Sequence, residues 1–199
     1  MNETRFLEAH VRVKHGKERE GQIANALKQQ VGLNIIEASD DDDKARKVDR
    51  WLDRNGKQIA LQIKYRETGE DLLFEVYDRW FDWDDHRNKV GRDMLGDAQL
   101  YAVLKTDKQT VVMVPTDYAK TIIREMIEIV QQHGWTVENH ISKTFRFFQH
   151  GHKIELKAQK DPRDGRQKMV AYIPAAVFES EAQLETYKAR LPRRWKQAA

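Results

Sequence analysis

The dipeptide Asn55-Gly56, placed between two segments of alternating polarity, restricts the fold of this chain more than any other feature. Asn-Gly is a preferred loop of two-residue β-hairpins, because both residues tolerate the positive φ angles that the turn requires. We therefore expect residues 47–52 (KVDRWL) and 57–66 (KQIALQIKYR) to form two antiparallel strands. In the second strand, alternation separates an apolar face from a mostly polar one. The apolar face consists of Ile59, Leu61 and Ile63. The mostly polar face consists of Ala60, Gln62, Lys64 and Arg66.

The hairpin brings together side chains that suit metal-assisted chemistry. Twelve residues separate Asp49 from Gln62, and the tight turn folds these two positions toward each other. Gln62 and Lys64 are two positions apart and so share a strand face. Magnesium prefers oxygen ligands, lowers the pKa of a bound water and neutralises charge that grows on phosphorus. We predict that Asp49, Gln62 and the Ile63 carbonyl hold the metal, while Lys64 orients water or stabilises negative charge.

An amphipathic helix precedes the hairpin, because apolar residues recur at helical spacing within residues 16–30. Glu20 lies in its first turns, and we predict that it approaches Asp49 and Lys64 and holds metal-bound water. A solvated helix face is the competing interpretation for this glutamate. The Asp49–Lys64 pair could likewise be a plain cross-strand salt bridge, which contributes only about 0–1 kcal/mol.

The remaining elements indicate an α/β or α+β sandwich. Thr116 and Gly134 are expected to cap and to stop a helix over residues 117–133. The other expected elements are strands at 72–77, 99–105, 110–114, 145–149, 153–159 and 167–174, and a final helix at 179–190.

Three other clusters carry weaker signals. The four aspartates at 40–43 lack the spaced ligands and the glycine of a calcium loop, so we expect an exposed polar loop. His150 and His152 flank a glycine and have no evident third ligand, which favours a hairpin turn over a metal site. The aromatic residues within 80–83 are expected to form local core rather than to stack on unpaired bases.

Length and composition favour one domain. The chain has 199 residues, of which 40% are hydrophobic and 34% are charged. It contains no cysteine, which excludes disulfides and thiolate metal sites. No segment approaches the roughly 18 apolar residues of a membrane-spanning helix, and we expect a cytoplasmic protein without membrane contact. Residues 138–199 carry 13 Lys and Arg against 7 Asp and Glu, which leaves a balance of −3 for residues 1–137 out of a total of +3.

The helix with Glu20, the strand with Asp49 and the segment Gln62-Ile63-Lys64 resemble the PD-(D/E)XK nuclease superfamily. This superfamily includes restriction endonucleases, Holliday-junction resolvases and lambda-type exonucleases, and the resemblance covers roughly residues 16–120. It implies a restriction-endonuclease-like α/β (α+β) fold, a mixed central β-sheet flanked by helices, here with a C-terminal β-rich extension. It also implies hydrolysis of nucleic acid that depends on Mg²⁺ or Mn²⁺, with DNA as the expected substrate.

Two positions depart from the pattern of the superfamily. Val48 stands where a proline often precedes the aspartate, and Gln62 stands where an acid is usual. The neutral amide weakens cation binding and favours one metal, so a carboxylate is expected from Glu20, with Asp71 and Glu75 as the next candidates. Gln62 also keeps open an alternative function, a catalytically inactive nuclease fold that binds nucleic acid. An interaction module that touches neither DNA nor RNA is a third hypothesis.

Basic and aromatic residues are predicted to contact the substrate. They are Tyr65, Arg66, Arg92, Arg193 and Arg194. We expect residues 1–137 to form the nuclease-like core and residues 138–199 to form a basic extension packed on it as one domain. Such an extension beside a carboxylate cluster would suit a polyanion, although a frayed basic tail is the competing interpretation for the last two arginines. A homodimer would also fit, because many relatives pair to cut two strands.

Overall fold

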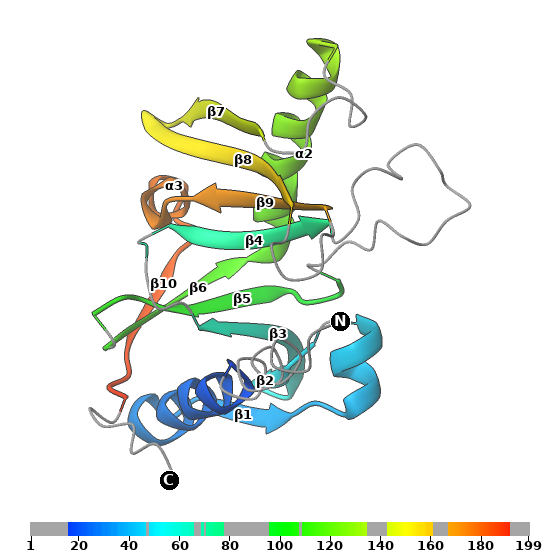
Figure 1. Ribbon diagram of the computed structural model, residues 1–199. Helices are drawn as coiled ribbons and strands as arrows, with labels where there is room; N and C mark the ends of the chain where they lie inside the picture. Colours follow the sequence, from blue (N-terminus) through cyan, green and yellow to red (C-terminus); the bar gives the residue numbers. More distant parts are fainter. Residues whose placement is uncertain are drawn as a thin grey trace, which may run out of the picture.

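Two β-sheets and a few helices make up the described part of the chain in this computed structural model (Figure 1). The described residues are 16–46, 48–65, 69, 71–77, 96–107, 109–134, 143–160 and 167–191. The six-stranded sheet has the strand order β1-β2-β3-β5-β6-β10, and the four-stranded sheet has the order β4-β9-β8-β7. The fold is therefore of the mixed α and β class.

The six-stranded sheet is mixed, because β3 and β5 run parallel whereas its other neighbours run antiparallel. Its strands are β1 (Asn34–Glu37), β2 (Arg50–Arg54), β3 (Lys57–Tyr65), β5 (Leu100–Leu104), β6 (Thr110–Pro115) and β10 (Glu185–Lys188). The four-stranded sheet is antiparallel throughout. Its strands are β4 (Leu72–Tyr77), β7 (Lys143–Gln149), β8 (His152–Lys160) and β9 (Gln167–Ile173).

Each face of the six-stranded sheet packs against its own hydrophobic core. The N-terminal helix is α-helical over residues 16–26 and continues as the π-helix η1 (Leu27–Val31), and it covers one face. The other face packs against α2 (Thr116–Gln132) and the inner face of the four-stranded sheet. Residues 60–63 of β3 are buried between these layers, so the centre of this strand is shielded on both sides. The buried apolar residues of α2 recur three or four positions apart: Ala119, Ile122, Ile123, Met126, Ile127 and Val130.

The predicted hairpin is confirmed. β2 and β3 pair antiparallel up to the residues that directly flank the turn. Asn55 and Gly56 have φ angles of 57° and 80°, as this two-residue turn requires. Leu61 and Ile63, on the apolar face that alternation predicted, belong to the core under the N-terminal helix, and Ala60 and Gln62 on the other face are buried as well.

The later strands also lie where their periodicity predicted them, from β4 to β9. The turn expected between the two histidines joins β7 to β8, with φ angles of 49° at His150 and 77° at Gly151. The aromatic residues at 80–83 lie outside the described residues.

The third predicted strand does not extend the central sheet. β4 pairs with β9 in the four-stranded sheet, and β5 is the strand that lies next to β3. Periodicity identifies a strand, but the sheet that it joins depends on which neighbours bury its two faces. The chain therefore combines a mixed six-stranded sheet with a second, antiparallel sheet.

The final helix predicted at residues 179–190 is wrong. A shorter helix, α3 (Ala175–Ser180), begins directly after Pro174, and β10 follows at the edge of the six-stranded sheet. Pairing with β6 satisfies the backbone of β10 and packs Tyr187 against the core under the N-terminal helix. These tertiary contacts outweigh the local helix propensity of the segment.

Two local predictions are also wrong. Thr116 is the first residue of α2 rather than its cap, and its hydroxyl donates a hydrogen bond to the carbonyl of Ala98. The tetra-aspartate is helical rather than a loop. Residues 40–41 are helical and lead directly into the π-helix η2 (Asp42–Arg46). The Ser39 hydroxyl accepts the backbone N–H of Asp42 and so caps this turn.

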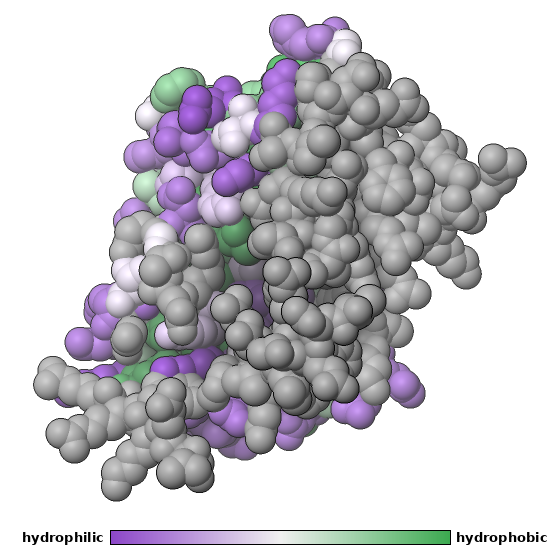
Figure 2. Space-filling model, viewed as in Figure 1, coloured by the Kyte–Doolittle hydropathy of each residue, from purple (hydrophilic) through white to green (hydrophobic). Residues whose placement is uncertain are grey.

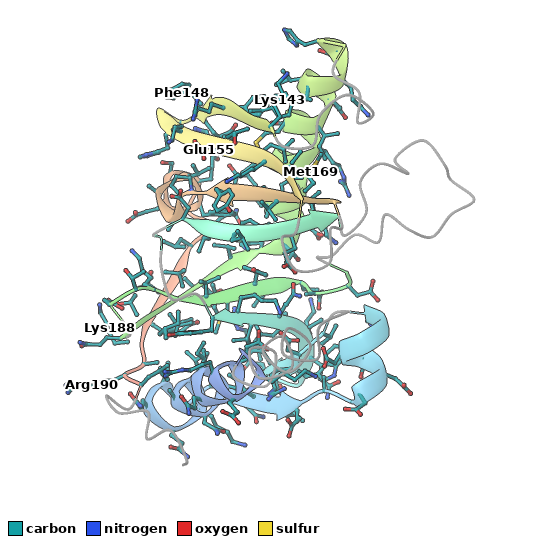
Figure 3. All side chains as sticks on the ribbon, viewed as in Figure 1. Lys143, Phe148, Glu155, Met169, Lys188 and Arg190 are labelled. Carbon is teal, nitrogen blue, oxygen red and sulfur yellow. The ribbon has the colours of Figure 1, made fainter. Side chains whose placement is uncertain are left out.

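Segments on both sides of residue 137 share the two sheets, because β10 pairs with β6 and β9 pairs with β4. After β10 the chain returns to η1, where the Gln30 side chain and the Arg190 backbone exchange two hydrogen bonds of 2.8 Å. Figure 3 labels Lys188 and Arg190 along this return. The division into a core and an extension at residue 137 stays a prediction.

The described surface is mainly hydrophilic on the side that Figure 2 shows, with isolated hydrophobic residues between the polar ones. Phe148 is the most exposed large hydrophobic residue of the described set, at 75%, and lies on the edge strand β7 (Figure 3). Single exposed apolar side chains are normal and need no partner. No helix within the described ranges is long and apolar enough to cross a membrane.

Candidate active site

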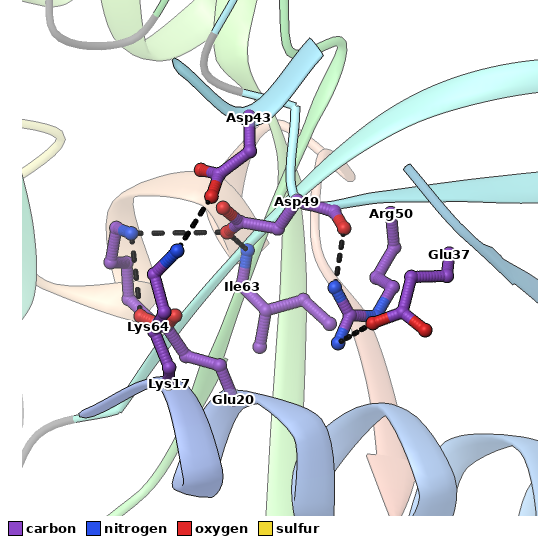
Figure 4. A network of polar contacts seen from close by, with 8 residues as sticks. All are labelled: Lys17, Glu20, Glu37, Asp43, Asp49, Arg50, Ile63 and Lys64. Atoms are coloured by element: carbon purple, nitrogen blue, oxygen red, sulfur yellow. Dashed lines mark hydrogen bonds and ion pairs between the residues drawn. The ribbon is translucent and has the colours of Figure 1, made fainter. Parts of the chain in front are cut away.

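Asp49 lies where the hairpin departs from regular pairing. Arg50 pairs with Leu61, and the Leu61 carbonyl also accepts the backbone N–H of Asp49 at 3.0 Å. Asp49 and Arg50 thus both lie opposite Leu61 of β3. This is the arrangement of a β-bulge, which changes the direction of the Asp49 side chain. The Oδ2 atom of Asp49 accepts the backbone N–H of Ile63 at 2.7 Å (Figure 4). The backbone of the same hairpin therefore orients this carboxylate.

The Lys64 ammonium lies between two carboxylates that come from different segments. Its Nζ atom is 3.3 Å from Oε1 of Glu20 and 3.8 Å from Oδ2 of Asp49 (Figure 4). The side chains of Glu20 and Asp49 are 20% and 11% exposed, so water screens these charges only in part. The structure thus brings together three of the four predicted catalytic residues, one from the N-terminal helix and two from the hairpin region.

Gln62, the fourth predicted catalytic residue, is placed differently. It is buried, at 5% exposure, and its Oε1 atom has no hydrogen-bond partner among the described residues. Alternation puts its side chain on the strand face of Lys64, and the strand register aligns it with Tyr101 of β5. An unpaired buried acceptor costs about 1–3 kcal/mol, so a ligand that binds this oxygen would recover free energy.

The two carboxylates beside Lys64 hold their protons more tightly than free ones. Burial raises the pKa of Glu20 and of Asp49, and the Lys64 ammonium offsets this only in part. The charge of Asp43, from η2, raises both pKa values further. Burial lowers the pKa of Lys64, but the carboxylates of Asp49, Glu20 and Glu75 outweigh it and the pKa is raised overall. Lys64 is therefore charged at neutral pH among a surplus of acidic groups.

The oxygen donors of this region suit a hard divalent cation. Asp49 supplies a carboxylate and Gln62 supplies an unpaired amide oxygen. The N–H and C=O of one residue in an antiparallel ladder point to the same neighbour, so the Ile63 carbonyl faces the edge that carries Asp49. In the described ranges, no three His, Cys, Asp or Glu side chains lie close enough together to hold a metal. One carboxylate with neutral oxygens and several waters fits Mg²⁺ or Mn²⁺ better than zinc or copper.

The residues predicted to contact substrate fall into two groups. Tyr65 ends β3, and the Arg19 guanidinium carbon lies 5.1 Å from the centre of its ring. Four others lie outside the described residues: Arg66, Arg92, Arg193 and Arg194. Asp71 and Glu75 were the next candidates for a carboxylate after Glu20. Glu75 of β4 lies near enough to raise the pKa of Lys64, whereas Asp71 directly precedes β4.

Four charged residues at the site were not predicted from the sequence. Nζ of Lys17 lies 2.9 Å from Oδ2 of Asp43. Arg50 donates a hydrogen bond to the Asp49 carbonyl at 2.6 Å and pairs with Glu37 at 3.2 Å. Lys17 is one helical turn before the predicted catalytic glutamate, and Arg50 directly follows Asp49, so both positions carried a local signal. Their partners are Asp43, from the tetra-aspartate that was expected to be an exposed loop, and Glu37 of β1, and both contacts join separate segments.

Glu20, Asp49 and Lys64 thus form one partly buried cluster, and Gln62, whose side-chain oxygen is unpaired, lies two residues before Lys64 in β3. Comparisons with protein-family models, with curated proteins and with solved structures found no match.

Proposed function

We propose that this protein is a metal-dependent nuclease of the PD-(D/E)XK type, which hydrolyses phosphodiester bonds in nucleic acid, with DNA as the preferred substrate. One observation carries the proposal. The Lys64 ammonium lies 3.3 Å from Glu20 and 3.8 Å from Asp49. An oriented carboxylate beside an ammonium and a second, proton-accepting carboxylate is the set of groups that phosphodiester hydrolysis needs.

Each residue has a distinct role in this proposal. Asp49, Gln62 and the Ile63 carbonyl would hold one Mg²⁺ or Mn²⁺ ion, which would supply activation of water and neutralisation of phosphate charge. Lys64 donates charge-assisted hydrogen bonds to the attacking water or to a phosphate oxygen. Burial raises the pKa of Glu20, which makes this carboxylate a better proton acceptor than a free glutamate.

The element order supports a restriction-endonuclease-like core. A helix with an acidic residue precedes the β2–β3 hairpin, β3 pairs in parallel with β5, and α2 follows β6 on the opposite face from the first helix. We infer that the four-stranded sheet is an addition to that core. A cytoplasmic location and a homodimer belong to the same proposal.

One observation favours a second candidate function, a catalytically inactive nuclease fold that binds nucleic acid. Gln62 is neutral where the superfamily usually has an acid, and it is 5% exposed. A ligand set in which Asp49 supplies the one carboxylate and the other oxygens are neutral would bind Mg²⁺ weakly. Under this alternative, nucleic acid binds in a salt-dependent way and is not cut with any metal.

A cleavage panel separates the two functions. Linear, nicked, single-stranded and junction DNA, and one RNA, are incubated with Mg²⁺ or Mn²⁺ and resolved on denaturing gels. We expect cleavage by the wild type and at least roughly 100-fold less by Asp49→Asn and by Lys64→Met, because each loses a group that stabilises the transition state.

Asp53→Asn is the matched control, because Asp53 lies in the same hairpin and its Oδ1 accepts the Gly56 N–H, which asparagine can also accept. It should cleave like the wild type. Binding without cleavage by the wild type would select the second function, and cleavage that survives both site substitutions would contradict the proposed active site.

A further inference from the structure

A hollow of about 350 Å³ lies directly beside the candidate site, between the N-terminal helix and strands β1 and β2. It is lined, among the described residues, by Gly21, Ala24, Asn25, Lys28, Ile35, Glu37 and Arg50. Gly21 is the neighbour of Glu20 in the helix, and Arg50 is the neighbour of Asp49 in the hairpin. The hollow and the candidate site therefore share two pieces of backbone.

Arg50 is held in place mainly by the backbone that carries Asp49. Its Nη1 atom donates to the Asp49 carbonyl at 2.6 Å. Figure 4 shows Asp49 between the two cations, with its carboxylate toward Lys64 and its carbonyl toward Arg50. A Cβ at Gly21 would lie 3.9 Å from Nη2 of Arg50, so any longer side chain at this position would begin to cover the guanidinium. The glycine leaves that face of Arg50 open to the hollow.

Arg50 forms an ion pair with Glu37, and its charge also acts on the Asp49 carboxylate. Its partner Glu37 lies 3.2 Å away, but the Glu37 side chain is 79% exposed, so water competes for this pair. Lys28 adds a second positive charge to the lining. The lining thus carries two cations against the one carboxylate of Glu37, and an anion that displaced Glu37 from Arg50 would meet both cations.

We propose that this hollow binds the phosphate next to the one that is cleaved, with Arg50 as its principal ligand and Lys28 as the second. The inference rests on the proposed nuclease function and names a substrate subsite for it. A guanidinium presents a planar set of donors that matches two phosphate oxygens. The exposed carboxylate of Glu37 holds this guanidinium only weakly, so a phosphate can replace it. A strand that crosses this end of the hairpin then contacts Lys64 with one phosphate and Arg50 with its neighbour.

The test measures binding without cleavage. The full chain in EDTA is titrated against a fluorescein-labelled single-stranded DNA 12-mer, and anisotropy is followed at several salt concentrations. Arg50→Gln is expected to weaken binding about 10-fold and to reduce the salt slope by about one, because one phosphate contact is lost. Lys28→Gln is expected to weaken binding about threefold.

Glu37→Gln gives the opposite sign. It frees Arg50 from its carboxylate and is expected to tighten DNA binding about threefold. A purely structural role for the Arg50–Glu37 pair predicts no tightening. Arg54→Gln, on the same strand, and Glu128→Gln, on the exposed side of α2, are the charge-matched controls and should each leave the affinity within a factor of about two. Circular dichroism verifies that each variant is folded, and the exposed positions 28 and 37 keep the test decisive if Arg50→Gln does not fold.

The outcomes separate this inference from the proposed function. The expected binding pattern in a protein that never cleaves supports the subsite and contradicts the nuclease. Cleavage by the wild type together with unchanged binding by Lys28→Gln and Glu37→Gln contradicts the subsite alone. Inorganic phosphate is the remaining arm: if it binds wild type as tightly as the 12-mer does, the hollow is a site for a free anion and the nucleic-acid subsite is overturned.

Discussion

The two ends of β2 carry polar clusters of similar composition that differ in how far their charges are paired. At one end, Lys64 is shared by Glu20 and Asp49. At the other end, Arg54 forms two hydrogen bonds to Glu185 from β10, and the Tyr187 hydroxyl donates to the same carboxylate. Each cluster pairs one cation with a carboxylate from a distant segment, Glu20 in the first and Glu185 in the second.

The pKa values show how the clusters differ. The hydrogen bond from Arg54 holds the pKa of Glu185 below its usual value, and burial together with Glu185 raises the pKa of Tyr187 to about 12. Burial instead raises the pKa of Glu20 and of Asp49. The charges of Arg54 and Glu185 thus balance each other, whereas the Lys64 cluster retains negative charge that a bound proton or cation would neutralise. Unrelieved charge of this kind is typical of functional sites rather than of structural ion pairs.

The largest expected difference between the Lys64 cluster and the Arg54 cluster concerns the affinity for a divalent metal. Gln62→Glu adds a carboxylate at the unpaired amide oxygen and is expected to strengthen Mg²⁺ or Mn²⁺ binding by roughly 10-fold, as measured by isothermal titration calorimetry. Gln58→Glu is the matched control, because Gln58 lies on the same strand and pairs with Asp53 at the Arg54 end. It should leave the affinity unchanged. Equal effects of the two substitutions would mean that Gln62 has no special relation to a metal.

A smaller effect concerns stability at neutral pH. Glu20→Gln removes a carboxylate whose ionisation the fold disfavours, so the free energy of unfolding should stay constant or rise slightly. Glu185→Gln removes a partner of Arg54 and should lower it by about 1 kcal/mol, a value reduced because the Glu185 side chain is 38% exposed. Urea denaturation at pH 7 measures both. Destabilisation of the same size in the two variants would remove the distinction between the clusters.

The smallest effect is the pH dependence of these differences, measured in EDTA. The lowered pKa of Glu185 means that its contribution is present above its ordinary value of 4.5 and is lost as the pH falls through the folded value. The raised pKa of Asp49 has the opposite consequence, because its contribution is present below 3.8 and is lost as the pH rises through the folded value.

Between about pH 3 and pH 7, Asp49→Asn should therefore gain stability relative to the wild type as the pH rises, while Glu185→Gln should lose it. Urea denaturation at several pH values gives both slopes. Slopes of the same sign would contradict the contrast between the two ends of β2.

Much of the local structure could be predicted from the sequence. The Asn55-Gly56 turn, the buried face of β3 and the apolar stripe of α2 follow from φ preferences and from periods of two and 3.6 residues. The same period of two predicts that Gln62 and Lys64 share a strand face, and both residues lie within β3. The helix predicted at 179–190 failed because a free edge of the sheet at β6 decided that segment, and no local pattern reports a free edge.

The sequence by itself determined the Asn55-Gly56 turn and the alternation of β3, because these features depend on neighbouring residues. The tertiary structure decided which polar residues meet. The contact of Glu20 with Lys64 spans 44 positions, and that of Arg54 with Glu185 spans 131. Such contacts form only when the N-terminal helix and β10 bury apolar surface against the sheet, so the free energy of packing, and not the polar residues themselves, brings the charges together.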